Sequence, residues 1–325
     1  MKSFEYVAPN SVKEVTALLA DTWGKTEVLA GGTDLVTCLK QHLTEPERVV
    51  SLRNIKELRG IRSEKAGLRI GAMTTLAELA DNKTVQAQFP ALITAIKGIG
   101  SPQLVNVGTV GGDLCQRPRC WYFRNGFGLF GKAGGESLVR VGDNRFHAIF
   151  GTGGDALFVS ASSLGPPLVA LGASITVEGP GGKRHEIAAA EFFRAPASEK
   201  SRETSVKPDE IVTSVLVPIN GLKNTTYEVR HRGGLDWPYV TASVAFRVER
   251  GVIADARVAL GHVAATPWSA REAASAINGQ RADAGAAAKA AAASITGAQP
   301  LSRNAYKVQL VKTAVKRAMM VAMAT

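Results

Sequence analysis

Two glycine-rich turns constrain this chain more than any other feature, because each leads from an apolar run directly into a helical pattern. They are Leu29-Ala30-Gly31-Gly32-Thr33-Asp34-Leu35 and Gly108-Thr109-Val110-Gly111-Gly112-Asp113-Leu114. Glycine has no Cβ, so the backbone can approach a ligand and point consecutive N–H groups at it. A helix that starts at Thr33 or Asp34 favours an anion at its N-terminus. The first turn therefore suits a pyrophosphate. The alternative interpretation of the same residues is an ordinary tight turn with an aspartate N-cap.

A matched second turn favours a dinucleotide, because a dinucleotide needs contacts along its whole length.

The order of strand and helix patterns divides the chain into three parts. Residues 1–55 alternate strands and helices, which predicts βαβ connections. Residues 56–220 contain further strand patterns and the second turn, together with a basic, aromatic and glycine-rich insertion over 115–155. Residues 223–325 run from strands to alanine-rich helices, which predicts an α+β domain of three strands and a helical bundle.

Composition excludes several classes of protein. No run approaches the roughly 18 apolar residues of a membrane-spanning helix, so we expect no membrane insertion. The start of the chain lacks an apolar signal core, so we expect no export signal of its own. Three cysteines, Cys38, Cys115 and Cys120, favour a reducing compartment.

The net charge is +11, and from residue 223 onward the chain has 14 Lys/Arg and 6 Asp/Glu. These charges are scattered without a nucleic-acid motif, so we expect a solvated or partner-facing surface rather than nucleic-acid binding.

Other candidate motifs fail on their context. Gly126–Gly131 has the spacing of a dinucleotide fingerprint, but no clean strand precedes it and no helix follows. Gly179–Lys183 is followed by Arg184 rather than Ser or Thr and is typical of a hairpin turn. The five histidines are dispersed, and no convincing catalytic triad is present. We therefore predict no acid–base catalyst and no metal ligand in this chain.

The two turns together resemble those of the FAD-binding medium subunit of molybdenum hydroxylases. That family includes the medium subunits of carbon monoxide, xanthine and aldehyde dehydrogenases. Two further segments are similar to it, Leu68–Leu76 between the turns and Leu260–Trp268 in the third part. The resemblance implies an α+β chain. Its FAD-binding domain would be an α/β domain of the vanillyl-alcohol-oxidase-like (PCMH) type in two parts, residues 1–55 and 56–220. Residues 223–325 would form the C-terminal domain.

Within the family, the insertion is most similar to the periplasmic aldehyde oxidoreductase type. The similarity lies in Leu114–Arg124 and in Asp236-Trp237-Pro238. Relatives with this insertion usually hold an extra [4Fe–4S] cluster through four of its cysteines. Here the insertion contains only Cys115 and Cys120, and no cysteine follows them. We therefore predict that the extra cluster is absent and that the insertion has become a loop.

For the site, the resemblance implies backbone contacts from the first turn to the FAD pyrophosphate and contacts from the second turn to its other side. The residues implied are Leu29, Ala30, Gly31, Gly32, Thr33, Asp34, Leu35, Thr109, Gly112 and Asp113. Two departures predict looser binding. Asp113 stands where the family more often has asparagine, and Ser160–Ser163 stands where many relatives carry a Pro-Ser-Asp turn, so an acidic contact is missing at Ser163.

For function, the resemblance implies an oxidoreductase subunit of a heterotrimer. A large partner would hold a molybdenum pterin cofactor and oxidise the substrate, and a small partner would carry two [2Fe–2S] clusters. This chain would take electrons on FAD and pass them to an external acceptor. The alternatives are a flavin-free scaffold subunit and a stand-alone FAD oxidoreductase. The compartment would be the cytoplasm, or the periplasm if a partner carries the export signal.

Overall fold

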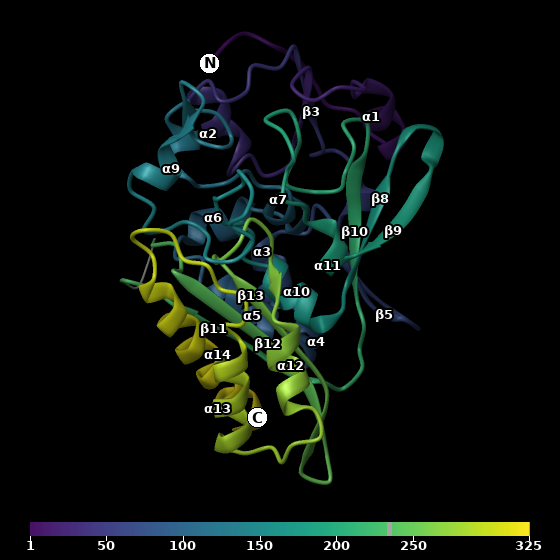
Figure 1. Ribbon diagram of the computed structural model, residues 1–325. Helices are drawn as coiled ribbons and strands as arrows, with labels where there is room; N and C mark the ends of the chain where they lie inside the picture. Colours follow the sequence, from purple (N-terminus) through teal and green to yellow (C-terminus); the bar gives the residue numbers. More distant parts are fainter. Residues whose placement is uncertain (233–235, 325) are drawn as a thin grey trace.

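The computed structural model describes residues 1–232 and 236–324 of the chain. Across these residues the strands form three sheets and one small hairpin (Figure 1). No helix within the two ranges is long and apolar enough to cross a membrane. The fold is a mixture of helices and strands, which confirms the predicted α+β class. We propose the division 1–55, 56–220 and 223–325, because each part carries a sheet of its own.

The first part is a parallel three-stranded sheet. Its strands β1 (Glu5–Val7), β2 (Thr26–Leu29) and β3 (Arg48–Ser51) pair in the order β1-β3-β2. Helix α1 (Val12–Leu18) connects β1 to β2, and α2 (Leu35–Lys40) connects β2 to β3. Parallel neighbours need such crossover connections, so the predicted βαβ pattern is confirmed. The first glycine-rich turn lies between β2 and α2.

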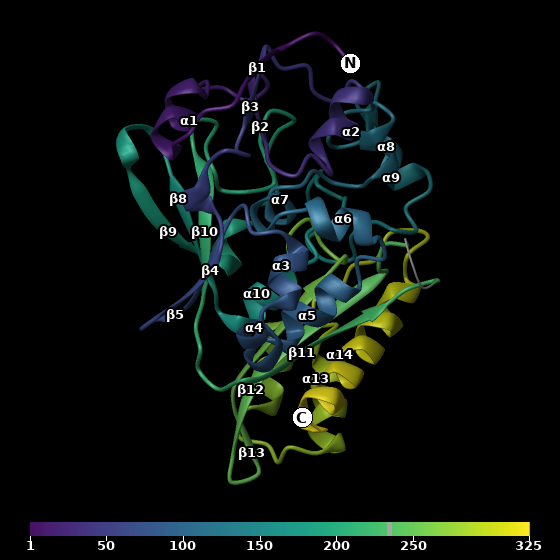
Figure 2. The ribbon, with the colours of Figure 1, turned by 180° about the vertical axis from the view of Figure 1, so that it is seen from behind.

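The second part is an antiparallel five-stranded sheet with helices packed against it (Figure 2). The strand order is β4-β5-β10-β8-β9, in which the strands are β4 (Ile61–Glu64), β5 (Gly67–Gly71), β8 (Ser174–Glu178), β9 (Arg184–Ala188) and β10 (Ile211–Val217). Its helices are α3 (Leu76–Asp81), α4 (Lys83–Gln88), α5 (Pro90–Lys97), α6 (Pro102–Val107), α7 (Val110–Leu114), α10 (Gly165–Leu171) and α11 (Ala189–Phe192). Short 3₁₀ turns occupy Lys56–Leu58 and Pro180–Gly182. The second glycine-rich turn lies between α6 and α7.

The insertion is more ordered than the predicted loop. It contains α8 (Trp121–Arg124), a hairpin of β6 (Lys132–Ala133) and β7 (Glu136–Ser137), and α9 (Leu138–Val141). A small apolar core holds these elements, and its buried members are Phe123, Leu129, Phe130, Ala156, Phe158 and Ala265. The expectation of a plain loop was wrong because elements of two to four residues are too short to produce a periodic pattern.

The third part is an antiparallel sheet covered by helices. Its order is β11-β12-β13-β14, with β11 (Lys223–Val229), β12 (Val240–Glu249), β13 (Val252–Gly261) and β14 (Trp268–Ser269). The helices are α12 (Arg271–Ile277), α13 (Ala284–Ala293) and α14 (Tyr306–Ala324). The prediction of three strands missed β14, which has only two residues. Helix α14 packs against β11 and β12 through residues spaced three or four apart, namely Val311, Ala314, Val315, Ala318, Met319 and Ala322.

One buried lysine joins α14 to the insertion and to the loop after β13. Lys307 Nζ donates to the carbonyl oxygens of Phe146 (3.2 Å), His147 (3.0 Å) and His262 (2.6 Å). Burial lowers the pKa of Lys307, whereas three carbonyl acceptors favour its ammonium form. Burial and the charge of Lys307 also lower the pKa of His147 to about 4 and that of His262 to about 3.

Lowering the pH from 7 to 5 is expected to reduce the free energy of unfolding by about 2 kcal/mol for each of these histidines. Both pKa values lie below the ordinary 6.5 in the folded chain. Below pH 6.5 the unfolded chain therefore binds more protons than the folded chain, so the free energy of unfolding decreases as the pH falls. Urea denaturation at pH 7 and pH 5 measures the loss.

The double variant His147→Gln/His262→Asn should lose most of this pH dependence. The control His185→Gln replaces a histidine that is exposed on β9 and should keep it. Equal pH dependence in all three proteins would contradict the assignment.

Candidate functional site

The first glycine-rich turn lies against the end of α6, which directly precedes the second turn. A Cβ on Gly31 would stand 1.9 Å from the carbonyl oxygen of Val107, so only glycine allows this approach. Gly32 follows with a φ of +74°, a left-handed conformation that favours glycine. In the described part of the chain, no hydrogen bond engages the backbone N–H groups of Gly31, Gly32 or Thr33. The turn therefore offers three consecutive donors to a ligand.

The second turn is held by its own cap. Thr109 is the N-cap of α7, and its hydroxyl oxygen accepts from the Gly112 N–H at 3.1 Å. The Gly108 carbonyl accepts from the Leu76 N–H, and the Gly111 N–H donates to the Ala72 carbonyl. These bonds attach the second turn to the end of β5 and the start of α3, so its position relative to the five-stranded sheet is set by the backbone.

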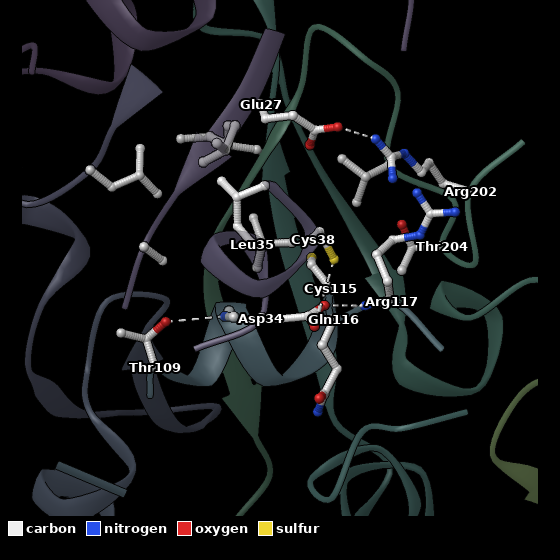
Figure 3. Close-up of a pocket in the computed structure, with 18 of the residues that line it drawn as sticks. Glu27, Asp34, Leu35, Cys38, Thr109, Cys115, Gln116, Arg117, Arg202 and Thr204 are labelled. Carbon is white, nitrogen blue, oxygen red and sulfur yellow. Dashed lines mark hydrogen bonds and ion pairs between the residues drawn. The ribbon is translucent and has the colours of Figure 1, made fainter. Parts of the chain in front are cut away.

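Both turns line one cleft, and Figure 3 shows residues of each beside it. Its main chamber has a volume of about 190 Å³ and also contacts Trp23, Glu27 and Arg202. A smaller groove of about 120 Å³ continues it and shares Thr33, Thr109, Gly112 and Gln116 with the main chamber. The cleft is therefore elongated and runs along both turns.

Most of the predicted site residues line this cleft. The main chamber contacts Ala30, Gly31, Gly32, Thr33, Asp34, Leu35, Thr109 and Gly112, and the smaller groove contacts Asp113. Leu29 is the last residue of β2 and is not among the residues that line either chamber. The structure brings the two turns together, and their contact with FAD stays a prediction.

Asp113 binds the backbone of a neighbouring segment. Its carboxylate accepts from the Ser162 hydroxyl (2.6 Å), the Ser163 N–H (3.1 Å) and the Leu164 N–H (2.9 Å). Burial raises the pKa of Asp113, and these three hydrogen bonds oppose that effect. The Asp113 carboxylate therefore holds residues 162–164 beside the cleft.

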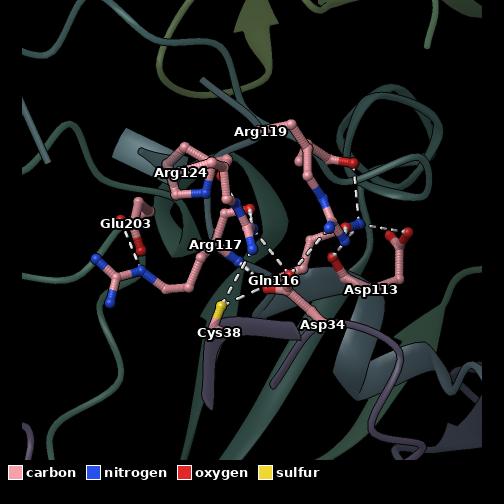
Figure 4. A network of polar contacts seen from close by, with 10 residues as sticks. Asp34, Cys38, Asp113, Gln116, Arg117, Arg119, Arg124 and Glu203 are labelled. Atoms are coloured by element: carbon pink, nitrogen blue, oxygen red, sulfur yellow. Dashed lines mark hydrogen bonds and ion pairs between the residues drawn. The ribbon is translucent and has the colours of Figure 1, made fainter. Parts of the chain in front are cut away.

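A cluster of arginines from the insertion surrounds Asp34 (Figure 4). Its carboxylate accepts from the Arg117 N–H (2.7 Å) and from the Arg124 guanidinium (2.8 Å), and forms an ion pair with Arg119 (3.1 Å). Arg124 also donates to the Cys38 sulfur on α2 at 3.2 Å. The Asp34 side chain makes no N-cap bond to α2. It accepts from the Cys38 thiol on that helix at 3.9 Å, and its other partners come from the insertion.

Sequence patterns did not identify the outer wall of the cleft. The Arg202 guanidinium lies 4.8 Å from the Trp23 ring centroid and pairs with Glu27. Next to it, Glu203 accepts from Arg117 Nε at 3.1 Å, and burial raises the pKa of Glu203 to about 7. Residues 202–204 follow the first turn by about 170 positions, and no local motif marks them.

The cysteines of the insertion do not meet in a cluster. Cys115 is exposed, and the Cys120 sulfur lies 3.1 Å from His147 Nε2. Within residues 1–232 and 236–324, no three or more His, Cys, Asp or Glu side chains are placed to hold a metal ion. The absence of a [4Fe–4S] cluster stays a prediction that iron analysis must test.

Family models match nearly the whole chain. The model for the FAD binding domain in molybdopterin dehydrogenase matches residues 2–220, and that for the CO dehydrogenase flavoprotein C-terminal domain matches residues 225–322. The carbon monoxide dehydrogenase medium chain of Hydrogenophaga pseudoflava is 30% identical over 97% of this chain and 96% of its own. The aldehyde oxidoreductase FAD-binding subunit of Escherichia coli is 29% identical over 96% of each chain.

Solved structures agree with these similarities. Carbon monoxide dehydrogenase from Hydrogenophaga pseudoflava superimposes with a TM-score of 0.77 at 29% identity, covering 99% of this chain and 97% of the other. Quinoline 2-oxidoreductase from Pseudomonas putida 86 gives 0.77 at 25% identity, covering 100% and 99%. From the family models, the relatives and the shared fold, the chain belongs to the family of FAD-binding medium subunits of molybdenum hydroxylases.

Proposed function

We propose that this chain binds FAD and transfers electrons from the [2Fe–2S] clusters of a small partner subunit to an external acceptor. A large partner subunit would hold the molybdenum pterin cofactor and oxidise the organic substrate. The observation that carries the proposal is the elongated cleft that both glycine-rich turns line. Its shape suits a dinucleotide, and medium chains of carbon monoxide dehydrogenase and the FAD-binding subunit of aldehyde oxidoreductase are similar over nearly their whole length.

The residues of the cleft fit the cofactor. The N–H groups of Gly31, Gly32 and Thr33 have no other partner in the described part of the chain and would donate to the diphosphate. Backbone donors need no side chain, so the missing Cβ of glycine leaves room for phosphate oxygens. The second turn would line the opposite side through Thr109, Gly112 and Asp113, as we predicted.

The electrostatics of the first turn also favour a diphosphate. Asp34 is the carboxylate nearest in sequence to those backbone N–H donors. Its negative charge alone would repel a bound anion. Two guanidinium groups, Arg119 and Arg124, pair with Asp34 and offset its charge. These arginines therefore make an acidic residue tolerable at a site for an anion.

The chemistry that FAD supplies when bound is the acceptance and release of either one or two electrons. The chain contributes binding, orientation and a surrounding that excludes solvent from part of the cofactor. We propose no acid–base catalyst in this chain. Its location stays a prediction: the cytoplasm, or the periplasm if a partner carries the export signal.

Replacing Gly31 with alanine should weaken FAD binding at least about tenfold. The new Cβ would collide with the Val107 carbonyl oxygen, so the two turns must separate. Flavin content per purified chain and titration of the flavin-free chain with FAD measure the effect. Gly153→Ala is the control, because a Cβ there has no heavy atom within 4 Å. Unchanged FAD affinity in Gly31→Ala would contradict the site.

Replacing Arg124 with methionine should also weaken FAD binding, by about tenfold, because Asp34 loses a charged partner and the insertion loses its contact with Cys38. Arg145→Met is the matched control in the same insertion, since Arg145 pairs with Asp143 on the surface. Equal FAD affinity in both variants would show that the Asp34 cluster has no part in cofactor binding.

An absorbance spectrum and metal analysis of the purified native complex test the function as a whole. We expect flavin bands, molybdenum, and about four irons per heterotrimer, which correspond to two [2Fe–2S] clusters. About eight irons would mean that the extra cluster is present despite the missing cysteines. Iron and molybdenum without flavin would make the chain a scaffold. Substrate turnover by the isolated chain without molybdenum would support a stand-alone FAD oxidoreductase.

A further inference from the structure

Residues 302–307, which include the first turn of α14, hold residues 144–148 of the insertion. We call residues 302–307 the clasp. Asn144, which is fully buried, accepts a hydrogen bond from the Arg303 N–H at 2.9 Å. The clasp also donates to backbone carbonyl oxygens through the Asn304 amide, the Tyr306 hydroxyl and the Lys307 ammonium. The third part of the chain therefore holds this segment of the insertion.

Lys307 is the buried charge of the clasp. The residue is only 1% exposed, and its Nζ donates to the carbonyl oxygens of Phe146, His147 and His262. An ammonium has three N–H donors and no acceptor, so protonated Lys307 satisfies all three carbonyls. A neutral amine has only two N–H donors and would direct its lone pair at the third carbonyl. The charge of Lys307 therefore determines how firmly residues 146 and 147 are held.

The held segment contacts the start of α8 in turn. The Trp121 ring lies edge-on to the rings of Phe146 and His147, at centroid distances of 5.4 and 5.9 Å. The Tyr122 ring lies 5.8 Å from the His147 ring, and the Cys120 sulfur lies 3.1 Å from His147 Nε2. Three consecutive residues at the start of α8 therefore pack against the segment that the clasp holds.

The last residue of α8 contacts the first glycine-rich turn. The Arg124 guanidinium donates to the Asp34 carboxylate (2.8 Å) and to the Pro118 carbonyl (2.8 Å). The Arg117 N–H donates to the other Asp34 oxygen at 2.7 Å (Figure 4). Asp34 directly follows residues 31–33, whose N–H groups are the donors that we assign to the diphosphate. A contiguous path of packed rings and hydrogen bonds thus leads from the clasp to these donors.

We propose that Lys307 is a positioning residue for FAD. Its ammonium holds α8 in place, and through Arg124 and Asp34 it positions the N–H groups of the first turn. This inference rests on the proposed function of that turn. Lys307 itself lines neither the main chamber nor the smaller groove, so its effect on the cofactor is transmitted through the path. Such coupling is demonstrated by the non-additivity of substitutions along the path.

The first test is titration of the flavin-free chain with FAD at pH 6. Lys307→Met keeps an unbranched apolar side chain and removes the three donors, so it should weaken FAD binding about fivefold. Lys316→Met is the matched control, because it makes the same substitution at an exposed position of α14. It should bind FAD as the wild type does. Equal affinity in folded Lys307→Met and in the control would overturn the proposal.

A double-mutant cycle tests the path itself. Arg124→Met removes the contact with Asp34 at the end of the path. If Lys307 acts through Arg124, the double variant Lys307→Met/Arg124→Met should bind FAD about tenfold more weakly than the wild type, as Arg124→Met alone does. Independent effects would instead multiply to about fiftyfold and would overturn the path.

The pH dependence separates the charge of Lys307 from the packing of its stem. Burial lowers the pKa of Lys307 to about 7, and the three carbonyl acceptors oppose that shift, so the ammonium is lost as the pH rises above 7. The difference in FAD affinity between the wild type and Lys307→Met should therefore shrink from about fivefold at pH 6 to less than about twofold at pH 9.5. A constant ratio over this range would show an effect of packing alone and would overturn the proposal.

The histidines that face Lys307 do not titrate in this range. The pKa values of His147 and His262, about 4 and 3, leave both rings neutral from pH 6 upward. Burial raises the pKa of Glu203 in the main chamber to about 7. Its titration affects FAD binding in the wild type and in Lys307→Met alike, so the ratio of the two affinities is the measurement to use.

The remaining charged groups around the clasp keep one charge state over the same range. Asp143 stays ionised, because its hydrogen bond with Arg145 lowers its pKa. Tyr306 stays neutral, because burial raises its pKa to about 12. The guanidinium groups of Arg230 and Arg303 keep their charge.

Trp121→Leu interrupts the path and leaves Lys307 in place. It removes the ring contacts with Phe146 and His147 and should weaken FAD binding about fivefold. Phe127→Leu is the matched control, because Phe127 is a 45% exposed ring of the same insertion. Should circular dichroism show that Lys307→Met does not fold, this pair decides, and equal affinity in the two leucine variants would overturn the proposal.

Amide hydrogen exchange tests the path without the cofactor. In the flavin-free chain, residues 117–124 should exchange at least about threefold faster in Lys307→Met than in the wild type, whereas β8 should exchange equally in both. Unchanged exchange over residues 117–124 would overturn the path. A wild-type chain that binds no FAD would refute the proposed function, and the exchange rates would still decide whether Lys307 positions α8.

Discussion

The contact between Gly31 and the carbonyl oxygen of Val107 is the constraint on which the site depends. It brings a strand-to-helix turn of the parallel sheet against the turn that starts α7 on the five-stranded sheet. A side chain at residue 31 would need space that the backbone of residue 107 already occupies. Because the contact is backbone to backbone, both turns line one cleft, whose main chamber also contacts Trp23 and whose smaller groove contacts Trp237.

The insertion links this cleft to the third part of the chain. Its arginines hold the carboxylate of Asp34, and one of them, Arg119, also lies against the Trp237 ring. Lys307 on α14 in turn holds the backbone carbonyls of His147 and His262. Guanidinium–carboxylate pairs, a small apolar core and a buried ammonium therefore hold the insertion in place.

Local chemistry made part of this arrangement predictable. The glycines of both turns, the strand before the first turn and the Thr109 cap are adjacent in sequence, so their pattern was visible. The outer wall of the cleft was not predictable, since Arg202 and Glu203 reach Glu27 and Arg117 only after the chain has crossed the second part. The insertion was wrongly expected to be a loop because Phe123 and Phe158 contribute to one small core from positions 35 residues apart.

The sequence by itself determined where the backbone can approach a ligand, the order of the three parts and the family to which the chain belongs. These properties depend on residues that are neighbours along the chain or on motifs in a set order. Only the tertiary structure decided which charges surround Asp34, what Asp113 binds and which carbonyl oxygens Lys307 contacts. Such contacts join segments tens to hundreds of residues apart, and their energies depend on burial, which no local pattern records.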